Sequence, residues 1–500
     1  MSYLGLDIGT TGCKAVAFSD AGVEISRAYI EYGLLSPAPG YAELDADAVA
    51  SSCLSVIKQA ASASGRDPVN ALSISSQGEA FVPVDGSNMP LMNAMVSSDS
   101  RARTVMENYL LHFSADDLYR KTGHTAHPMF SLFKLAWLRE HEPELMSRAA
   151  HFYCFEDFIH TKLGITPAIG FPLAARTMLF NSSTCAWDAS ILDSIGLTPE
   201  KLARPLPSGT VAGVIPDAIA LSLNLAPGCI IAAGAHDQPC GALGVGAVDE
   251  GIAAYSAGTV ECITPVFNTR VMSPALEQAN LATYAHAVTG KYVSVAFSLT
   301  GGNIIKWFRD EFGERERAAA AQTKTDVYDA LLAAMPDEPT SLMSLPYFTP
   351  SGTPHFDIDT PGCITGLRLS THRGEILKCL IEGVGYEMRH NLDLLAAAGV
   401  AVTELRMTGG GSKNRRLVQL KADILGCPVY RMGMSEGGAR GAAILAMSAH
   451  TGGNIRAISK SWILPGEHIE PRRKASDRYA ERMAEYRSLY TMMKTLSACR

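Results

Sequence analysis

Apolar and polar positions at the start of the chain follow the pattern of a β-hairpin. Residues 3–18 begin with YLGLDI, pass through a GTTG turn and continue with KAVAF, and apolar segments on both sides of a glycine turn are typical of paired strands. A similar segment, IAAYSAGTVECITPVF, occupies residues 252–267. One hairpin near the start of each half favours two similar halves with a boundary near residue 250, although short Gly-Thr turns also resemble one another by chance.

Apolar residues recur at helical spacing in the second half of the chain. Over residues 375–398 they fall near the 3.6-residue period and predict a core helix. Residues 414–425 carry an apolar face, and Gly426 with a proline close behind predicts the end of that helix. The preceding LRMTGGGSKN predicts a strand that enters this helix through a glycine turn. Further helices are expected over 435–450, which is rich in small residues, and over the charged segment 470–495.

Composition narrows the classes of protein to which the chain can belong. Its 500 residues suggest about two to four domains. Hydrophobic residues make up 47% and charged residues 19%, which excludes a globally disordered chain. The net charge of −7 argues against nucleic acid or an acidic membrane surface as the main partner.

The cysteines and the first residues indicate a compartment. Eleven cysteines are scattered singly and none forms a CxxC pair, which argues against a disulfide framework or a cysteine zinc site and favours a reducing environment. The first residues do not form a signal peptide, and no apolar run approaches the length of about 18 residues that spans a membrane. We therefore expect a cytoplasmic protein with no membrane partner.

The first glycine turn has the composition of a phosphate-binding loop. Backbone N–H groups of such turns are unpaired and can approach an anion closely, and threonine hydroxyls add donors. Thr10, Thr11 and Gly12 would surround phosphate oxygens, and Lys14 would add a cation. Asp7 would repel a bare phosphate, so its position favours a magnesium ion between the two. The alternative for this motif alone is an ordinary hairpin turn.

Two further turns are candidates for the same role. Gly258-Thr259 lies in the second hairpin, and the run from Gly409 through Gly410 and Gly411 to Asn414 precedes the helix over 414–425. Each alone is also compatible with a structural loop. Because the chain lacks GxxxxGK followed by Ser or Thr, the three turns together favour a nucleotide site that is not a P-loop.

Asp237 is the candidate catalytic base. Residues 230–246 read IIAAGAHDQPCGALGVG, a buried strand that passes through His236-Asp237-Gln238 into a helix of small residues. Phosphoryl transfer depends on positioning, charge neutralisation and a base that orients the attacking hydroxyl. The alternative is that Asp237 caps the following helix. For His236, a structural role or a place at the edge of the substrate is preferred to metal binding.

At this point the motifs resemble those of the FGGY carbohydrate kinases, within the actin-like ATPase superfamily. The resemblance extends from about Leu4 to Ala446 and keeps the order of the family's motifs. The matching segments are DIGTTGCK, PGYAELD, SSQGEA, SSDSRA, PMFSLFKLAWL, GAHDQPCGALG, SAGT, TGGNIIKWFRDEFG, LPYFTPSGTP, IEGVGYEMR, TGGGSKN and ADILGCPV.

The resemblance implies an α/β fold with two ribonuclease-H-like domains around a central cleft. Residues 1–247 would form the N-terminal domain, with the sugar side and the first phosphate turn. Residues 248–500 would form the C-terminal, nucleotide-binding domain with a terminal helix. ATP and Mg²⁺ are the implied cofactors, a small sugar or polyol is the partner, and a homodimer is possible.

The resemblance also implies roles for individual residues. Asp7 matches the acid on the magnesium side, and Asp237 matches the base that takes a proton from the acceptor hydroxyl. Gly78, Glu79 and Gln238 match positions that bind the sugar or polyol together with Asp237. With the turns described above, the expected ATP-binding residues are Thr10, Thr11, Gly12, Lys14, Gly258, Thr259, Gly302, Gly410, Gly411 and Asn414.

Departures from the family pattern bear on the acceptor. Glu79 and Gln238 resemble glycerol kinases more than xylulose kinases, yet Gly78, Ser97 and Met129 stand where glycerol kinases carry Arg, Trp and an aromatic residue. If these positions line one pocket, it has room for four to six carbons. We expect a xylulokinase-like pentulose kinase, with a glycerol- or erythritol-type polyol kinase as the alternative.

The sequence also allows two other functions, and it leaves two roles for one further motif. A non-kinase actin-like ATPase would lack the sugar-side segments at 75–80 and 97–102, and a silent binding protein would not need Asp7 and Asp237. Asp99 and Arg101 form a D-x-R pattern that predicts either a salt bridge or a direct substrate contact.

Overall fold

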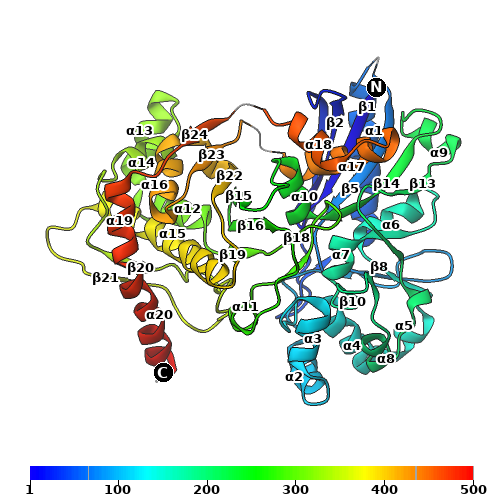
Figure 1. Cartoon of the computed structure of the whole chain (residues 1–500), viewed down its shortest axis with the longest axis horizontal. Coiled ribbons are helices and arrows are strands. Elements are labelled where there is room, and N and C mark those ends of the chain that lie inside the picture. The colour runs from blue at the N-terminus through cyan, green and yellow to red at the C-terminus, as the bar shows by residue number, and fades with distance from the viewer. Residues whose placement is uncertain (66, 434–435, 465, 499–500) are drawn as a thin grey trace.

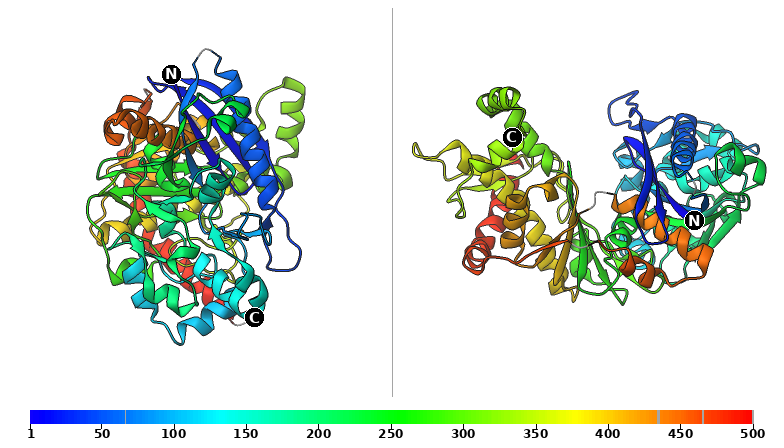
Figure 2. Two further views of the ribbon diagram at one scale, coloured as in Figure 1. Left: turned by 90° about the vertical axis from the view of Figure 1, so that its right-hand side faces the viewer. Right: turned by 90° about the horizontal axis from the view of Figure 1, so that it is seen from above.

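The computed structural model describes the 500-residue chain except for residues 66, 434–435, 465 and 499–500. Strands and helices are mixed throughout, as the predicted α/β class requires, and two separate sheets form the centres of two bodies (Figures 1 and 2). The strands of the first sheet all lie before residue 237, and those of the second all lie after residue 251.

The first sheet has six strands in the order β13-β14-β5-β1-β2-β3. Strands β1, β5 and β14 are parallel, whereas β2, β3 and β13 run antiparallel to their neighbours. The predicted hairpin over 3–18 is confirmed by the pairing of β1 with β2. The strands are β1 (Ser2–Ile8), β2 (Gly12–Ser19), β3 (Glu24–Glu31), β5 (Val69–Ser76), β13 (Val211–Val214) and β14 (Ile230–His236).

The two faces of this sheet are covered by different helices. Successive side chains of a strand point to opposite faces, and in β1 the leucines Leu4 and Leu6 join the core formed with α1 (Ala46–Ala63) and α6 (Phe155–Lys162). On the other face, Tyr3 and Gly5 meet α17 (Gly437–Thr451). A Cβ on Gly5 would overlap the carbonyl oxygen of Ala439. Glycine therefore permits the close approach of α17.

Helices α17 and α18 (Ile455–Ser461) come late in the sequence but pack in the first body. Helix α17 crosses β1, β5 and β14 and lies against α10 (Asp237–Gly244). Figure 1 shows both helices in orange beside the blue strands. The predicted helix over 435–450 is confirmed from Gly437 onward, and residue 435 lies outside the described part of the chain.

The second sheet repeats the hairpin-and-parallel-strand design of the first. Its path is β17-β18-β16-β15-β22-β23-β24, with β19 also paired to β16. The predicted hairpin over 252–267 is confirmed as β15 and β16, and β15, β22 and β23 are parallel. The strands are β15 (Ile252–Ala257), β16 (Glu261–Phe267), β17 (Tyr284–Ala285), β18 (Tyr292–Val293), β19 (Ala296–Ser298), β22 (Glu404–Thr408), β23 (Val429–Arg431) and β24 (Glu467–Ile469).

Long helices pack around the second sheet. The predicted core helix is α15 (Arg373–Ala397), and the helix expected over 414–425 is α16 (Arg415–Leu425). Gly426 ends α16 in the left-handed conformation with φ 69°, as its sequence predicts. The charged segment 470–495 forms two helices, α19 (Arg473–Glu481) and α20 (Met483–Ala498), instead of the one expected. Among the described residues, no helix combines the length and apolarity of a membrane span.

Candidate active site

The parallel strands of the first sheet place three predicted motifs at one edge. Ile8 of β1 pairs with Ser76 of β5, and Ser76 pairs with His236 of β14. Because these strands run in the same direction, the segments that follow them leave the sheet side by side. The first phosphate turn, the Gly78-Glu79 segment and Asp237 therefore originate from neighbouring strand ends.

Asp7 is half-buried beneath the start of α17. Its Oδ1 accepts a hydrogen bond of 2.6 Å from Ser75 Oγ, and a Cβ on Gly438 would lie 2.8 Å from the same oxygen. Burial raises the pKa of Asp7, helped by the charge of Glu436 and opposed by Ser75 and Lys14. Lys14 Nζ lies 2.5 Å from Glu436 Oε2, so this ammonium is paired with a carboxylate, and its contact with phosphate stays a prediction.

The turn that follows β1 is closed by its own backbone. The N–H of Gly9 donates to Gly12 O over 3.0 Å, and a Cβ on Gly12 would lie 2.8 Å from the carbonyl oxygen of Ile30. Thr10 Oγ1 donates to Gln77 Oε1 over 3.3 Å, which ties the turn to the next segment. Thr11 is exposed at the tip. The turn thus presents Thr11 toward solvent, and its contact with phosphate stays a prediction.

Asp237 is the first residue of α10 and does not cap it. The N-cap is His236, and no side-chain hydrogen bond caps this end, so the capping alternative is wrong. Oδ1 of Asp237 lies 3.1 Å from His236 Nε2 but has no hydrogen-bond partner. The side chain keeps 36% of its surface exposed.

The charge state of Asp237 is set by its surroundings. Burial, followed by the nearby carboxylates of Asp7 and Glu79, raises its pKa to about 7, although a hydrogen bond from Gln238 opposes the shift. His236 stays neutral because burial and the charge of Arg176 hold its pKa well below its usual value. A carboxylate with a pKa near neutrality is suited to accept a proton.

His236 links the first edge to the second body. Its Nδ1 lies 2.9 Å from the hydroxyl of Tyr284, the first residue of β17. This contact is structural, and the place at the edge of the substrate, which the sequence also allowed for His236, stays a prediction.

Glu79 is held on several sides in an unusual backbone conformation. Its φ of 63° is in the left-handed region, which costs a non-glycine residue energy. Its Oε1 accepts from Arg176 Nε at 2.5 Å and its Oε2 from Ser97 Oγ at 2.6 Å. Its carbonyl oxygen accepts from Ser131 Oγ and from Nζ of the buried Lys134. The carboxylate is therefore fixed before any acceptor binds.

Arg176, which no sequence motif indicates, fills the space beside Gly78. A Cβ on Gly78 would lie 3.0 Å from the His236 ring and 3.3 Å from Arg176 Cβ. The lack of a side chain at Gly78 is thus taken up by these two residues and does not leave a void. The guanidinium also lies over the Phe130 and Tyr284 rings. No local sequence pattern indicates this placement, because the partners of Arg176 are distant in the sequence.

The edge of the second sheet consists mainly of glycines. Ser256 of β15 pairs with Thr408 of β22 in a parallel ladder, so the segments after these strands also leave side by side. Gly409 has a φ of 87°, and a Cβ on it would lie 2.6 Å from the carbonyl oxygen of Ala257. Gly411 lies against the Ala257 side chain, whereas Gly410 borders open space.

The start of α12 (Gly302–Phe312) meets the same edge. The N–H of Gly302 donates to Gly258 O over 2.8 Å, and the N–H of Asn303 donates to Thr259 O over 3.2 Å. The structure thus brings the predicted residues Gly258, Thr259, Gly302, Gly410 and Gly411 together.

Asn414 already has partners within the protein. Its Oδ1 accepts from the backbone N–H groups of Arg416 and Leu417 and so caps α16. Its Nδ2 donates to Asp329 Oδ1 of α14 (Val327–Ala333) over 2.9 Å. The predicted nucleotide contact of Asn414 stays a prediction.

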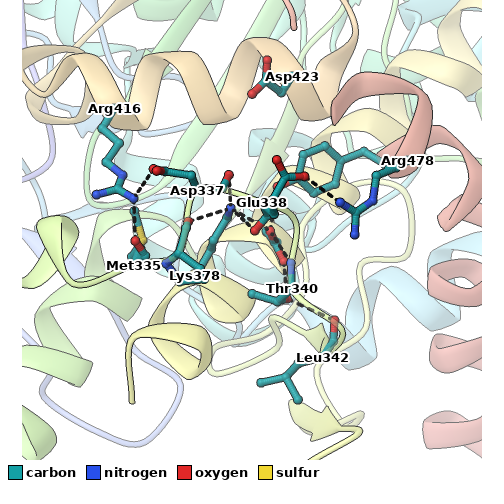
Figure 3. Close-up of polar contacts among 12 residues, drawn as sticks. Met335, Asp337, Glu338, Thr340, Leu342, Lys378, Arg416, Asp423 and Arg478 are labelled. Atoms are coloured by element: carbon teal, nitrogen blue, oxygen red, sulfur yellow. Dashed lines mark hydrogen bonds and ion pairs between the residues drawn. The ribbon is translucent and has the colours of Figure 1, made fainter. Parts of the chain in front are cut away.

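A buried lysine fixes the loop that follows α14. Nζ of Lys378 donates to the carbonyl oxygens of residues 336–338 at 2.7–3.0 Å, and Arg416 reaches Met335 O and Asp337 Oδ1 (Figure 3). A pocket of about 360 Å³ opens beside them. These cations are engaged by protein acceptors, so Lys378 holds the loop against α15 and Arg416 holds it and α14 against α16.

Comparison with family models shows to which protein family the chain belongs. The N-terminal domain model of the FGGY family of carbohydrate kinases matches residues 2–244, and its C-terminal domain model matches residues 253–450. The chain belongs to this family. The kinase is therefore a phosphotransferase that acts on an alcohol group of a carbohydrate.

Curated relatives of this kinase differ in their acceptors. It is 27% identical over 503 residues to the xylulose kinase of Staphylococcus epidermidis, covering 99% of this chain and 97% of the relative. It is 32% identical over 461 residues to the glycerol kinase of Ralstonia nicotianae, with 89% of each covered. The gluconokinase of Bacillus licheniformis is 28% identical over 457 residues, covering 89% of this chain and 87% of the relative.

Solved structures share the fold of this kinase. The ligand-bound xylulose kinase from Lactobacillus acidophilus matches with a TM-score of 0.89 and 22% identity, covering 99% of this chain and 98% of that one. The gluconate kinase from the same organism matches with a TM-score of 0.89 and 23% identity over the same shares. These likenesses confirm the predicted two-domain, actin-like architecture.

The D-x-R pattern of the kinase forms a salt bridge. Arg101 donates to Asp99 and to Glu43, and its guanidinium stacks 3.5 Å from the centre of the Tyr41 ring. Asp99 also accepts from the backbone N–H of Ala42. The side chains are almost fully buried. Of the two roles predicted for this pattern, the structure shows the salt bridge.

Kinases of this family use ATP, generally with Mg²⁺, and the residues present fit both. Asp7 is a half-buried carboxylate whose pKa is raised by burial, so a nearby cation would favour its ionised form. Gly410 leaves open space at the edge of the second sheet, where a nucleotide could lie against the backbone.

Proposed function

We propose that the kinase transfers the γ-phosphoryl group of ATP to a primary hydroxyl of a pentulose. The observation that supports this reaction is the placement of Asp237 at the edge of the first sheet, with a pKa of about 7 and a side chain that keeps 36% of its surface exposed. The pentulose is supported by the resemblance to the S. epidermidis xylulose kinase, which extends over almost the whole of both chains.

In the proposed reaction Asp237 acts as the general base. Its carboxylate accepts the proton of the acceptor hydroxyl while the hydroxyl oxygen forms a bond to the γ-phosphorus. The bond between that phosphorus and the bridging oxygen of ATP breaks, and ADP leaves with the bonding electrons. Glu79 and Gln238 bind other hydroxyl groups of the acceptor, while Gly78 lets Arg176 and His236 approach this segment.

The phosphates are held by both sheet edges in this proposal. Thr10, Thr11 and Gly12 contribute from the first, with Lys14 close by, and Asp7 holds Mg²⁺, which supplies neutralising charge when bound. From the second edge, the proposed nucleotide contacts are Gly258, Thr259, Gly302, Gly410, Gly411 and Asn414.

We also propose a separate role for each half of the chain. Residues 1–247 form the acceptor-binding domain and 248–500 the nucleotide-binding domain, with the α17 and α18 segment returning to pack on the first. Closure of these domains would exclude water and so limit wasteful hydrolysis of ATP. A homodimer and a cytoplasmic location also remain proposals.

One alternative acceptor class has its own support. Glu79 and Gln238 resemble glycerol kinases, and the R. nicotianae glycerol kinase is 32% identical to this chain. A glycerol- or erythritol-type polyol would use the same base and the same phosphate-binding residues.

A coupled assay of ADP release separates the two classes. The purified kinase is given ATP, Mg²⁺ and one acceptor at a time from a panel of pentuloses, tetritols, glycerol and gluconate. The highest kcat/KM is expected for a pentulose. Glycerol or a tetritol as the best acceptor would replace the proposal by its alternative, and ATP hydrolysis without dependence on any acceptor would reject kinase activity on this panel.

A further inference from the structure

Strand β14 contains a bulge shortly before the proposed base. Ala232 pairs with Ser73 of β5, but the next paired residue is Ala235, which lies opposite Ser75. Two residues of β14, Ala233 and Gly234, therefore oppose one residue of β5. Such a bulge bends a strand and changes the direction of the residues that follow it. Here those residues include His236 and Asp237.

A buried carboxylate from another element binds the bulge. Glu156, in the first turn of α6, is fully buried. Its Oε1 accepts from the backbone N–H of Gly234 over 2.7 Å, and its Oε2 accepts from the N–H of Gly170 over 3.1 Å. The two oxygens of one side chain thus bridge two segments of backbone.

The two bridged segments are in direct contact with each other. A Cβ on Gly170 would overlap Gly234 O, and a Cβ on Gly234 would overlap Ile74 O. Ser208 Oγ donates to Gly234 O over 2.7 Å, so both polar groups of the bulged glycine have partners. The backbone conformation at this point is therefore determined by contacts from several elements.

Each bridged segment leads to a charged group of the proposed site. Gly234 is followed by His236 and Asp237. Gly170 is the N-cap of α7 (Phe171–Ala175), and the residue that ends this short helix is Arg176, the ion-pair partner of Glu79. A shift at either glycine would move the base relative to the Arg176–Glu79 pair.

We infer that Glu156 is a positioning residue that sets the base and the Arg176–Glu79 pair at a fixed separation. The inference rests on the proposed role of Asp237. Burial of a carboxylate is costly, and burial raises the pKa of Glu156 to about 7, partly opposed by its two backbone donors. Glu156 makes no contact with the acceptor in this role, because it acts through backbone.

The neighbouring Asp157 provides a matched control. It is also buried, on the same helix turn, with a pKa raised by burial, and its Oδ2 accepts only a local hydrogen bond from the N–H of Cys154. Glu156→Gln and Asp157→Asn each exchange a carboxylate oxygen for an NH₂ group at nearly constant volume. Only Glu156→Gln places an N–H donor against the backbone N–H of Gly234 or of Gly170.

The test measures kcat, acceptor KM, ATP affinity and melting temperature for the whole chain carrying each variant. Misplacement of a reacting group by about 1 Å can reduce a rate about 100-fold, so Glu156→Gln is expected to lower kcat about 10- to 100-fold with ATP affinity within about twofold. Glu156→Asp, which keeps the charge, should recover part of the rate. Asp157→Asn should lower the melting temperature but keep kcat within about twofold.

Glu156 is only structural if Glu156→Gln and Asp157→Asn lower the melting temperature equally and leave kcat unchanged. If Glu156→Gln does not fold, Ser208→Ala removes the other anchor of Gly234, and an unchanged kcat there would overturn the inference.

If the unaltered kinase phosphorylates no acceptor, the proposed function fails, and crystal structures of the variants test the inference separately. Residues 233–237 should then be displaced in Glu156→Gln but not in Asp157→Asn; no displacement would contradict it.

Discussion

The proposed site residues project from one edge of each sheet, and these two edges carry different kinds of chemical group. The first edge carries ionisable side chains, among them Asp7, Glu79 and Asp237. Burial, followed by the charges of Asp7 and Glu79, raises the pKa of Asp237. The second edge is built from glycines and from the backbone of α12. One edge can therefore exchange protons, whereas the other can bind a ligand closely through its backbone. Changes at the first should alter the rate and its pH dependence, and changes at the second should alter nucleotide affinity.

The largest effect is expected when the base is removed from the first edge. Asp237→Asn keeps the size of the side chain but cannot accept the acceptor proton, so kcat should fall about 10²- to 10⁴-fold. ATP affinity, measured by calorimetry, should stay within about twofold because the proposed nucleotide contacts do not include Asp237. A loss of rate below about tenfold, or 1.4 kcal/mol of barrier, would show that another group accepts the proton.

The pH profile gives a second way to separate the edges. Asp237 must be ionised to act as a base, and its pKa is raised to about 7, so kcat/KM should fall about tenfold for each pH unit below 7. Glu79→Gln removes one carboxylate that raises this pKa and should move the fall to lower pH. The control is Asp237→Asn, whose residual rate should show no such fall. A flat profile between pH 6 and 8 in the unaltered kinase would contradict the assignment.

A single methyl group tests the second edge. Gly410 borders open space and has no left-handed φ, so Gly410→Ala is compatible with the fold. If the nucleotide lies against Gly410, the added Cβ should raise the KM for ATP about tenfold, equivalent to 1.4 kcal/mol, with the melting temperature unchanged. Gly86→Ala is the matched control, because Gly86 is also exposed, unhindered and in a loop. Equal ATP KM values for both variants would place the nucleotide elsewhere.

Local sequence signals were sufficient to predict several of these features. The hairpins over 3–18 and 252–267 were predictable because alternation and glycine turns are local signals. The same holds for α16, whose end at Gly426 is set by a local left-handed turn. Asp237 could be proposed from the strand-to-helix junction alone.

Long-range packing produced the features that the sequence did not reveal. Lys14 pairs with Glu436, 422 positions away, and α17 packs on the first sheet although it follows the second hairpin. Arg176 and Glu156 act through segments whose neighbours in space are distant in the sequence. A local pattern carries no information on such contacts, so ion pairs and bridges of this kind need the structure.

Asn414 gives the smallest expected effect and the sharpest test of the second edge. Its Oδ1 caps α16, while its Nδ2 contacts Asp329. Asn414→Ala removes the cap and should lower the free energy of unfolding by about 1 kcal/mol, whereas Asn414→Ser keeps an acceptor and should cost only a few tenths. If the amide also contacts the nucleotide, both variants should raise the KM for ATP by the same factor, about twofold, despite their different stabilities. A serine variant with an unaltered KM would leave Asn414 as a helix cap only, and the nucleotide contacts of this edge would then be confined to its glycines and backbone.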